Sequence, residues 1–302
     1  MDTPFSKPGR FYKGNLHGHS DRSDGRRGVA DVCATYRDAG WDFISLTDHF
    51  LEEYDWPLTD ATAHETPAFR TIRGAELHPT RDRMAHGERW HIVAVGLPAD
   101  FAPAAPDETG PELADRALAA GAYVVAAHPQ WFAMSEADML ALGPVDAVEI
   151  YNASCVDDND TGESTSMLDQ MLCRGRRVNA CATDDSHFVL NARDRLAGWT
   201  MVRSESNDPA ALVAALKAGD SYASTGPEIV DLWIEPGKRL WIRTTPASRV
   251  FAIGGPAVYR TVGEHGLTEA EIDLAGWRSP FLRVVVRDDD GRKAWTNPFW
   301  FD

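Results

Sequence analysis

The chain has 302 residues, and 46 acidic against 30 basic side chains give it a formal net charge of −16. This length predicts one large domain, or one domain with a small addition. The acidic balance argues against a broad basic surface that holds nucleic acid, but it leaves room for a small anionic substrate at a bound metal ion. No apolar run reaches the roughly 20 residues that a membrane span needs.

The N-terminal segment and the cysteines favour a cytoplasmic protein. Residues 1–8 lack the apolar core of a secretory signal. The four cysteines form no C-x-x-C pair, which argues against a disulfide framework and against a zinc ribbon. They are Cys33, Cys155, Cys173 and Cys181. We expect all four to be buried as small apolar residues.

Up to about residue 226, short apolar segments alternate with helical patterns. The predicted strands are 12–17, 43–47, 71–77, 90–97, 123–128, 147–151, 178–183 and 200–203. The predicted helices are 29–39, 111–120, 136–142, 164–174 and 208–218. The strands are mostly apolar on both faces, which is typical of a parallel sheet. The alternation therefore predicts an α/β fold, either a barrel or a doubly wound sheet.

The pattern changes after Gly226. Short alternating segments are separated by turn signals such as Pro236-Gly237 and Asp290-Gly291. The segments are 229–234, 240–244, 249–252, 281–286 and 294–301. This pattern predicts a small all-β domain over residues 227–302, which follows an α/β domain over residues 1–226.

Side chains that bind metals follow the ends of the predicted strands. They are His17, His19, Asp48, His49, Glu76, His128, Asp184, Asp185 and His187. The C-terminal ends of parallel strands meet at one mouth, so these side chains should gather there. His91 is an exception, because it stands at the start of its strand. Burying so many ionisable groups without metal would be costly, and the pattern therefore predicts a polynuclear metal site.

Several short motifs occur in an order that resembles the PHP (polymerase and histidinol phosphatase) superfamily. They lie at residues 15–20 (Asn-Leu-His-Gly-His-Ser), 23–25 (Ser-Asp-Gly), 47–49 (Thr-Asp-His), 74–76 (Gly-Ala-Glu), 127–129 (Ala-His-Pro) and 183–187 (Thr-Asp-Asp-Ser-His). His91, before an apolar strand and Gly96, occupies the place of a further family histidine. The resemblance implies a distorted (β/α)7 barrel of the PHP type with two or three divalent metal ions.

The resemblance also implies how the ligands are shared. The first ion would be held by His17, His19, Glu76 and Asp185, the second by Glu76, His91 and His128, and the third by Asp24, His49 and His187. Mixed nitrogen and oxygen ligands suit manganese, iron or zinc. Two positions have alternatives, since His86 could replace His91 and Asp184 could replace Asp185. His78 has no assigned role, and Glu149 is a candidate support for the site.

The predicted function is metal-dependent hydrolysis by a hydroxide that bridges two ions. Glu76 would bridge the ions, Asp48 would orient a histidine ring or relay a proton, and His187 is a second candidate for proton transfer. The family favours a phosphoesterase that acts on a small phosphorylated substrate. Six arginines in loops could contact such a substrate: Arg22, Arg26, Arg81, Arg83, Arg193 and Arg195.

Two alternatives remain open. The ending at residues 294–300 (Ala-Trp-Thr-Asn-Pro-Phe-Trp) resembles the branch of PHP-like hydrolases that includes carbaryl hydrolase, which favours a carbamate, ester or amide as substrate. The same residues also fit an edge strand whose tryptophans cover the barrel. The chain could instead be a catalytically silent PHP-like binding or regulatory module. The sequence does not give the oligomeric state.

Overall fold

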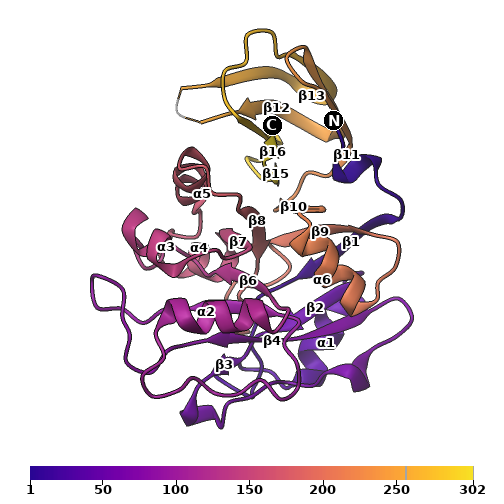
Figure 1. Cartoon of the computed structure of the whole chain (residues 1–302). Coiled ribbons are helices and arrows are strands. Elements are labelled where there is room, and N and C mark those ends of the chain that lie inside the picture. Colours follow the sequence, from indigo (N-terminus) through magenta and orange to yellow (C-terminus); the bar gives the residue numbers. More distant parts are fainter. Residues whose placement is uncertain (256, 302) are drawn as a thin grey trace.

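The computed structural model describes residues 1–255 and 257–301 of the chain. One sheet-rich body carries helices on its flanks, and a layer of long C-terminal strands lies at one end of it (Figure 1). The helices are α1 (Val29–Asp38), α2 (Gly110–Ala119), α3 (Glu136–Leu142), α4 (Ala153–Asn159), α5 (Thr165–Cys173) and α6 (Pro209–Lys217). None of these described helices is long and apolar enough to cross a membrane.

The strands up to residue 226 are β1 (Arg10–Asn15), β2 (Phe43–Leu46), β3 (His49–Phe50), β4 (Arg70–Leu77), β5 (Ile92–Val95), β6 (Tyr123–Ala126), β7 (Ala147–Asn152), β8 (Asn179–Thr183), β9 (Trp199–Ser204) and β10 (Ser221–Ser224). The later strands are β11 (Ile229–Glu235), β12 (Arg239–Ile253), β13 (Tyr259–Asp273), β14 (Phe281–Arg287), β15 (Lys293–Thr296) and β16 (Phe299–Trp300). The main path through the sheet runs β11-β12-β14-β15-β10-β9-β1-β2-β4-β5-β6-β7-β8.

The prediction of a parallel sheet is wrong for part of this path. Strand β5 is antiparallel to both of its neighbours, β4 and β6, and β9 is antiparallel to β1. The pairs β1–β2, β2–β4, β6–β7 and β7–β8 are parallel. The apolar run that suggested a parallel strand at β5 reflects burial on both faces, and burial alone does not set strand direction. The result is a mixed α/β fold.

Side chains bridge the open edge of β8. Among the described residues, the backbone ladder of β8 is shared with β7 alone, so the strand pairs do not confirm a closed (β/α)7 barrel. The hydroxyl of Thr200 in β9 lies 3.0 Å from the carbonyl oxygen of Ala182. The side-chain oxygen of Asn297 accepts a hydrogen bond from the Ala180 N–H (2.8 Å), and its amide nitrogen donates to the Ser221 carbonyl (3.2 Å). Asn297 therefore links β8 to β10 where no ladder forms.

Capping side chains explain where the predicted helices begin. Thr109 and Ser135 each form a capping box at the start of α2 and α3, and Asp208 caps α6 just before Pro209. The structure adds one helix that the sequence did not predict. This is α4, where Asn152 at the end of β7 accepts a hydrogen bond from the Cys155 N–H (2.9 Å) and starts the helix without a loop.

The C-terminal strands differ in length from the predicted ones, and the single segment predicted over residues 294–301 is two short strands, β15 and β16. Residues 239–253 form one continuous strand, β12, where two short strands were predicted, and β13 was not predicted. Most of β13 is exposed, so it lacks the apolar alternation that marks a strand. The predicted boundary near Gly226 falls between β10 and β11, but β15 pairs with β10 across it. The division into two domains stays a prediction.

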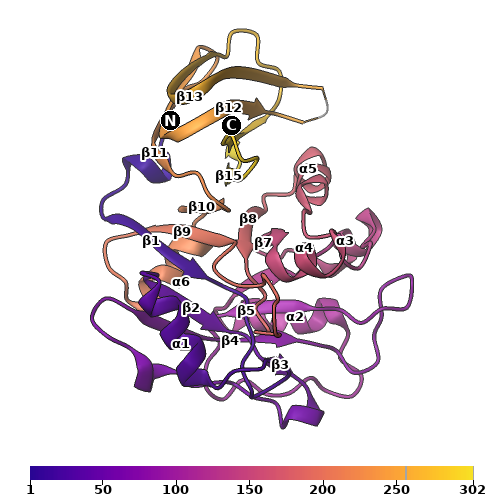
Figure 2. The same cartoon turned by 180° about the vertical axis from the view of Figure 1, so that it is seen from behind.

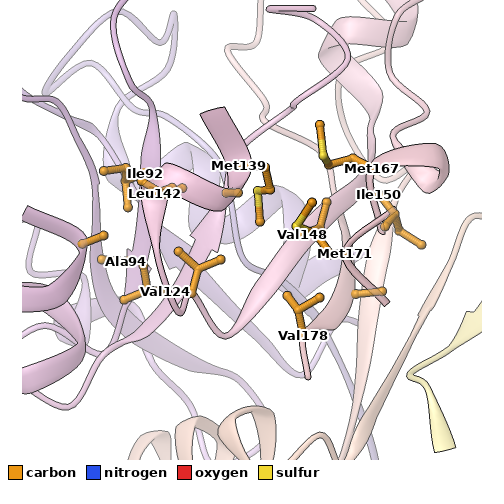
Figure 3. Packing of buried hydrophobic residues seen from close by; sticks show 14 of the residues in the cluster. Ile92, Ala94, Val124, Met139, Leu142, Val148, Ile150, Met167, Met171 and Val178 are labelled. Carbon is orange, nitrogen blue, oxygen red and sulfur yellow. The ribbon is translucent and has the colours of Figure 1, made fainter. Parts of the chain in front are cut away.

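The largest apolar cluster fills the space between the sheet and helices α2, α3 and α5. Figure 3 shows part of it, where Met139, Met167 and Met171 lie against strand residues such as Val148. A second cluster lies between the C-terminal strands. The expectation for the cysteines holds at three positions, but Cys173, at the end of α5, is exposed.

Candidate metal centre

The nine predicted metal ligands lie together at one end of the sheet. The first five are His17, His19, Asp24, His49 and Glu76, and the other four are His91, His128, Asp185 and His187. The direction of β5 explains the exceptional position of His91. Because β5 runs antiparallel to β4 and β6, its N-terminal end lies beside their C-terminal ends, and His91 joins Glu76 and His128 at the same mouth.

Glu76 lies at the centre of this cluster. One carboxylate oxygen is 2.5 Å from His91 Nδ1 and 3.4 Å from His128 Nε2, and the other is 2.8 Å from His49 Nδ1. Burial alone would raise the pKa of Glu76, but the histidines around it lower that pKa well below the usual range. Glu76 is therefore a fully ionised carboxylate with both oxygens directed at nitrogen ligands.

His17 carries an unsatisfied ring nitrogen. Its Nδ1 donates to Glu149 (2.8 Å), and its Nε2 faces the cluster. That nitrogen is fully buried without a hydrogen-bond partner, 3.1 Å from Asp185 Oδ1 and 3.6 Å from Glu76 Oε2. Buried polar atoms are normally partnered, and a histidine that donates to a carboxylate is the usual arrangement behind a metal ligand. The residues present therefore fit a bound metal ion.

A second subset surrounds Asp24. One oxygen of Asp24 lies 3.4 Å from His49 Nε2 and 3.5 Å from His187 Nε2, and the other lies 3.6 Å from His19 Nδ1. Burial lowers the pKa of His187, but the hydrogen bond to Asp24 and the charges of Asp185 and Asp24 together outweigh this effect and raise the pKa to about 9. Gly25 packs its α-carbon against the backbone of His19, where a β-carbon would lie 2.8 Å from the His19 carbonyl carbon. This close contact holds the Asp24 loop at the mouth.

The geometry does not divide the ligands uniquely among three ions. His19 is near Glu76 in one compact group and near Asp24 in another, and His17 also groups with His128 and Asp185. The division that the resemblance implies is one of the arrangements these groups allow.

His78 belongs to the cluster, although no role was predicted for it. Its side chain is buried, and its Nε2 lies 2.8 Å from His49 Nδ1, while its Nδ1 donates to the Trp90 carbonyl (3.0 Å). Burial lowers the pKa of His78 well below its usual value, as does the neighbouring His91. The available signal was the spacing from Glu76, since residues two apart in an extended chain face the same side and His78 directly follows β4. His86, the proposed substitute for His91, lies on an exposed loop.

Asp48 does not orient a histidine, contrary to the sequence prediction. Its buried carboxylate accepts hydrogen bonds from the Ser20 N–H (2.7 Å), the Ser23 hydroxyl (2.9 Å) and the Thr59 hydroxyl (2.6 Å). Asp48 therefore fixes the loop that carries His19 and Asp24. The carboxylate that pairs with a histidine ring is Glu149, which also accepts from the Thr183 hydroxyl (2.6 Å).

The neighbouring aspartates after β8 have different surroundings. Asp185 Oδ1 is 2.9 Å from His19 Nε2. Asp184 instead accepts from the Tyr36 hydroxyl (2.8 Å) and from the three N–H groups of residues 196–198. Asp185 and His128 both adopt positive φ, at 52° and 29°. Such backbone strain persists where the surroundings impose it, and it is common at functional sites.

The six arginines have mixed surroundings. Arg81 pairs with Asp107, and Arg195 pairs with Asp194. The backbone of Arg26 contacts a predicted ligand, because the Arg26 N–H donates to the His187 carbonyl (2.7 Å). Its side chain lines a hollow of about 800 Å³ beside α1.

No protein-family model matches the sequence, and no curated protein is significantly similar to it. A solved structure from Bacteroides vulgatus, a two-domain protein containing a predicted PHP-like metal-dependent phosphoesterase, matches 100% of this chain and 98% of its own, with a TM-score of 0.56 and 14% identity. A putative metal-dependent phosphoesterase from Bifidobacterium adolescentis and an amidohydrolase from Chromobacterium violaceum each match 58% of this chain and 87% of their own, with TM-scores of 0.40 at 14% and 15% identity.

The Bacteroides structure carries the comparison, since it matches the chain over its full length, the C-terminal strands included. The chain therefore shares the fold of this PHP-like two-domain structure. Its mixed α/β fold holds a buried histidine–carboxylate cluster at one end of the sheet.

Proposed function

We propose that this chain is a metal-dependent phosphoesterase that hydrolyses a small phosphorylated substrate. The observation that supports it is the arrangement around Glu76, whose two oxygens face His91 and His49 while the unpartnered nitrogen of His17 points to the same place. Such a convergence of nitrogen and oxygen ligands is what a cluster of divalent ions requires.

The chain's own residues have separate tasks in this proposal. Glu76 would bridge neighbouring ions, with the other predicted ligands shared as the family resemblance implies. When bound, the ions would supply a bridging hydroxide at neutral pH and polarise the scissile group. With only two ions bound, His187 is the proposed group for proton transfer, because its ring is part-exposed at the edge of the cluster. Glu149 would keep Nε2 of His17 free for an ion.

Arg26 favours an anionic substrate. Its backbone N–H donates to the His187 carbonyl, and Arg26 lines a hollow together with Arg27 and Arg195 and with the acidic residues Asp31 and Asp38. Guanidinium groups bind phosphate oxygens through charge-assisted hydrogen bonds. The carbamate alternative rested on the C-terminal ending, and Asn297 of that ending links β8 to β10, which is a structural role.

The test begins with the wild type loaded with manganese, iron or zinc. It is offered a phosphomonoester, a phosphodiester, a carboxylic ester and a carbamate. We expect turnover of the phosphomonoester. Turnover of the carbamate or ester alone would replace the proposal with the alternative hydrolase, and no turnover by metal-loaded protein would favour a silent binding module.

Glu76→Ala links the activity to the cluster. We expect it to lose bound metal and at least a hundredfold in kcat/KM, because it removes the side chain that three of the possible ligand groups share. Glu205→Ala, which removes an exposed carboxylate, is the matched control. Full metal content together with full activity in Glu76→Ala would show that the scheme is wrong.

A further inference from the structure

A large aromatic side chain stands exposed at the edge of the metal centre. Trp131 is 41% exposed, although aromatic side chains of this size are usually buried. Its ring lies edge-on to the ring of His128, with centroids 5.4 Å apart, and 6.4 Å from that of His91. Both histidines are predicted ligands that contact Glu76. The exposed indole therefore lies directly beside the place where a scissile group would bind.

The backbone around Trp131 holds the indole in place. Its N–H donates to the His128 carbonyl (3.0 Å), and the Met134 N–H donates to the Pro129 carbonyl (2.9 Å). Phe132 is nearly buried behind it, with ring centroids 4.7 Å apart and an interplanar angle of 75°. A side chain fixed in this way loses little conformational freedom when a ligand packs on it.

A second aromatic side chain flanks the same row of histidines. The rings of His128, His91 and His49 follow one another with centroids 5.1 and 5.8 Å apart. Tyr54 stacks beyond His49, at 6.3 Å and an interplanar angle of 19°. Aromatic surface therefore borders the row at both ends, while Glu76 contacts all three histidines.

We propose that Trp131 forms a subsite for a planar aromatic ring in the alcohol part of the substrate. A phosphate bound over Glu76 would place its ester group beside the indole, and a flat ring could stack on the exposed face of that indole. The subsite rests on the proposed function, because it assumes that the ester is cleaved at this cluster. The aromatic ring could come from an aryl-substituted alcohol or from a nucleobase, and these share the chemistry that Trp131 would recognise.

The test compares matched phosphate esters. Benzyl phosphate and ethyl phosphate both release primary alcohols, and adenosine 5′-monophosphate carries a nucleobase. We expect Trp131→Ala to lower kcat/KM for benzyl phosphate, for the nucleotide, or for both by about tenfold, and to change ethyl phosphate less than twofold. Trp131→Phe should restore part of the loss. The ester whose kcat/KM falls shows whether the subsite takes the ring of an aryl-substituted alcohol or a nucleobase. Equal changes for all three esters, or none, would overturn the subsite.

Two controls separate this result from other causes. Trp233→Ala removes a tryptophan that is 37% exposed on β11, in the C-terminal layer, and should leave all three rates unchanged. Metal content, measured on every variant, shows whether the His128 side of the cluster is intact. The affinities of benzylphosphonate and ethylphosphonate for the metal-loaded protein are also measured, because this readout does not depend on turnover. Lack of turnover of every phosphate ester would refute the proposed function, whereas a wild type without preference for benzylphosphonate would refute the subsite alone.

Discussion

The ring of His78 lies between the Trp90 carbonyl and the ring of His49. A carbonyl oxygen can only accept, so His78 Nδ1 carries the proton. In a neutral ring Nε2 then has only a lone pair. His49 Nδ1 lies 2.8 Å from this nitrogen and also 2.8 Å from a Glu76 oxygen, and because both can only accept, His49 Nδ1 carries a proton and His49 Nε2 faces Asp24. His78 is therefore a positioning residue that, together with Glu76, selects the nitrogen of His49 that faces an ion.

This arrangement predicts different results for two substitutions of His78. His78→Leu cannot accept from His49 and should weaken binding of one ion about 10- to 100-fold, whereas His78→Gln offers an amide oxygen and should restore part of the affinity. Calorimetric metal titration and nitrogen-15 shifts of the His49 ring in zinc-loaded protein provide the measurements. Metal bound to His49 Nδ1, or unchanged affinity in the leucine variant, would contradict the role.

At the scale of elements, Asn297 joins strands that have no common ladder. Its side chain satisfies the Ala180 N–H of β8 and the Ser221 carbonyl of β10, and it is almost fully buried. We expect Asn297→Ala to reduce the free energy of unfolding by about 2–3 kcal/mol, because two buried backbone groups lose their partners. Thermal or urea unfolding measures the loss.

Metal content and kcat should change little in the same variant, since Asn297 contacts β8 and β10 and none of the predicted ligands. Asn207→Ala, at a part-exposed asparagine that donates to the Pro67 carbonyl, is the control for stability. If Asn297→Ala lost activity at normal stability, residues 294–300 would belong to the active site. That result would favour the carbamate or ester hydrolase that the carbaryl-hydrolase resemblance implies.

At the scale of the whole molecule, the C-terminal strands lie away from the metal centre. Both views place β12 and β13 at the opposite end from β3, which carries His49 (Figures 1 and 2). These strands therefore do not cover the mouth. At that opposite end, Phe281 and Val285 of β14 and Trp295 of β15 pack into the same apolar cluster as residues of α3 and α5.

This shared core predicts that residues 1–226 do not fold alone. Removing residues 227–302 would expose that cluster and leave β10 without its partner β15. We expect the truncated chain to aggregate or to melt without a cooperative transition, as followed by circular dichroism and calorimetry next to the full chain. A truncated chain that melts cooperatively and binds the full number of ions would establish two independent domains.

The sequence predicts most of the elements because their signals are local. The apolar runs mark β2, β4 and β6 to within one or two residues, and capping residues such as Ser135 mark the helix starts. Strand β13 and helix α4 could not be predicted in this way. The first is an exposed strand stabilised by its long pairing with β12, and the second follows β7 without a turn signal.

The sequence by itself determined which side chains gather at the mouth, because Glu76, His128 and Asp185 each follow an apolar strand and strand ends meet in space. Only the tertiary structure decided the direction of β5, which brings His91 to them, since either direction buries the same apolar side chains. It also decided that Glu149, rather than Asp48, supports a histidine. Hydrogen-bond partners depend on distances between segments that lie far apart in the chain, and no local pattern encodes those distances.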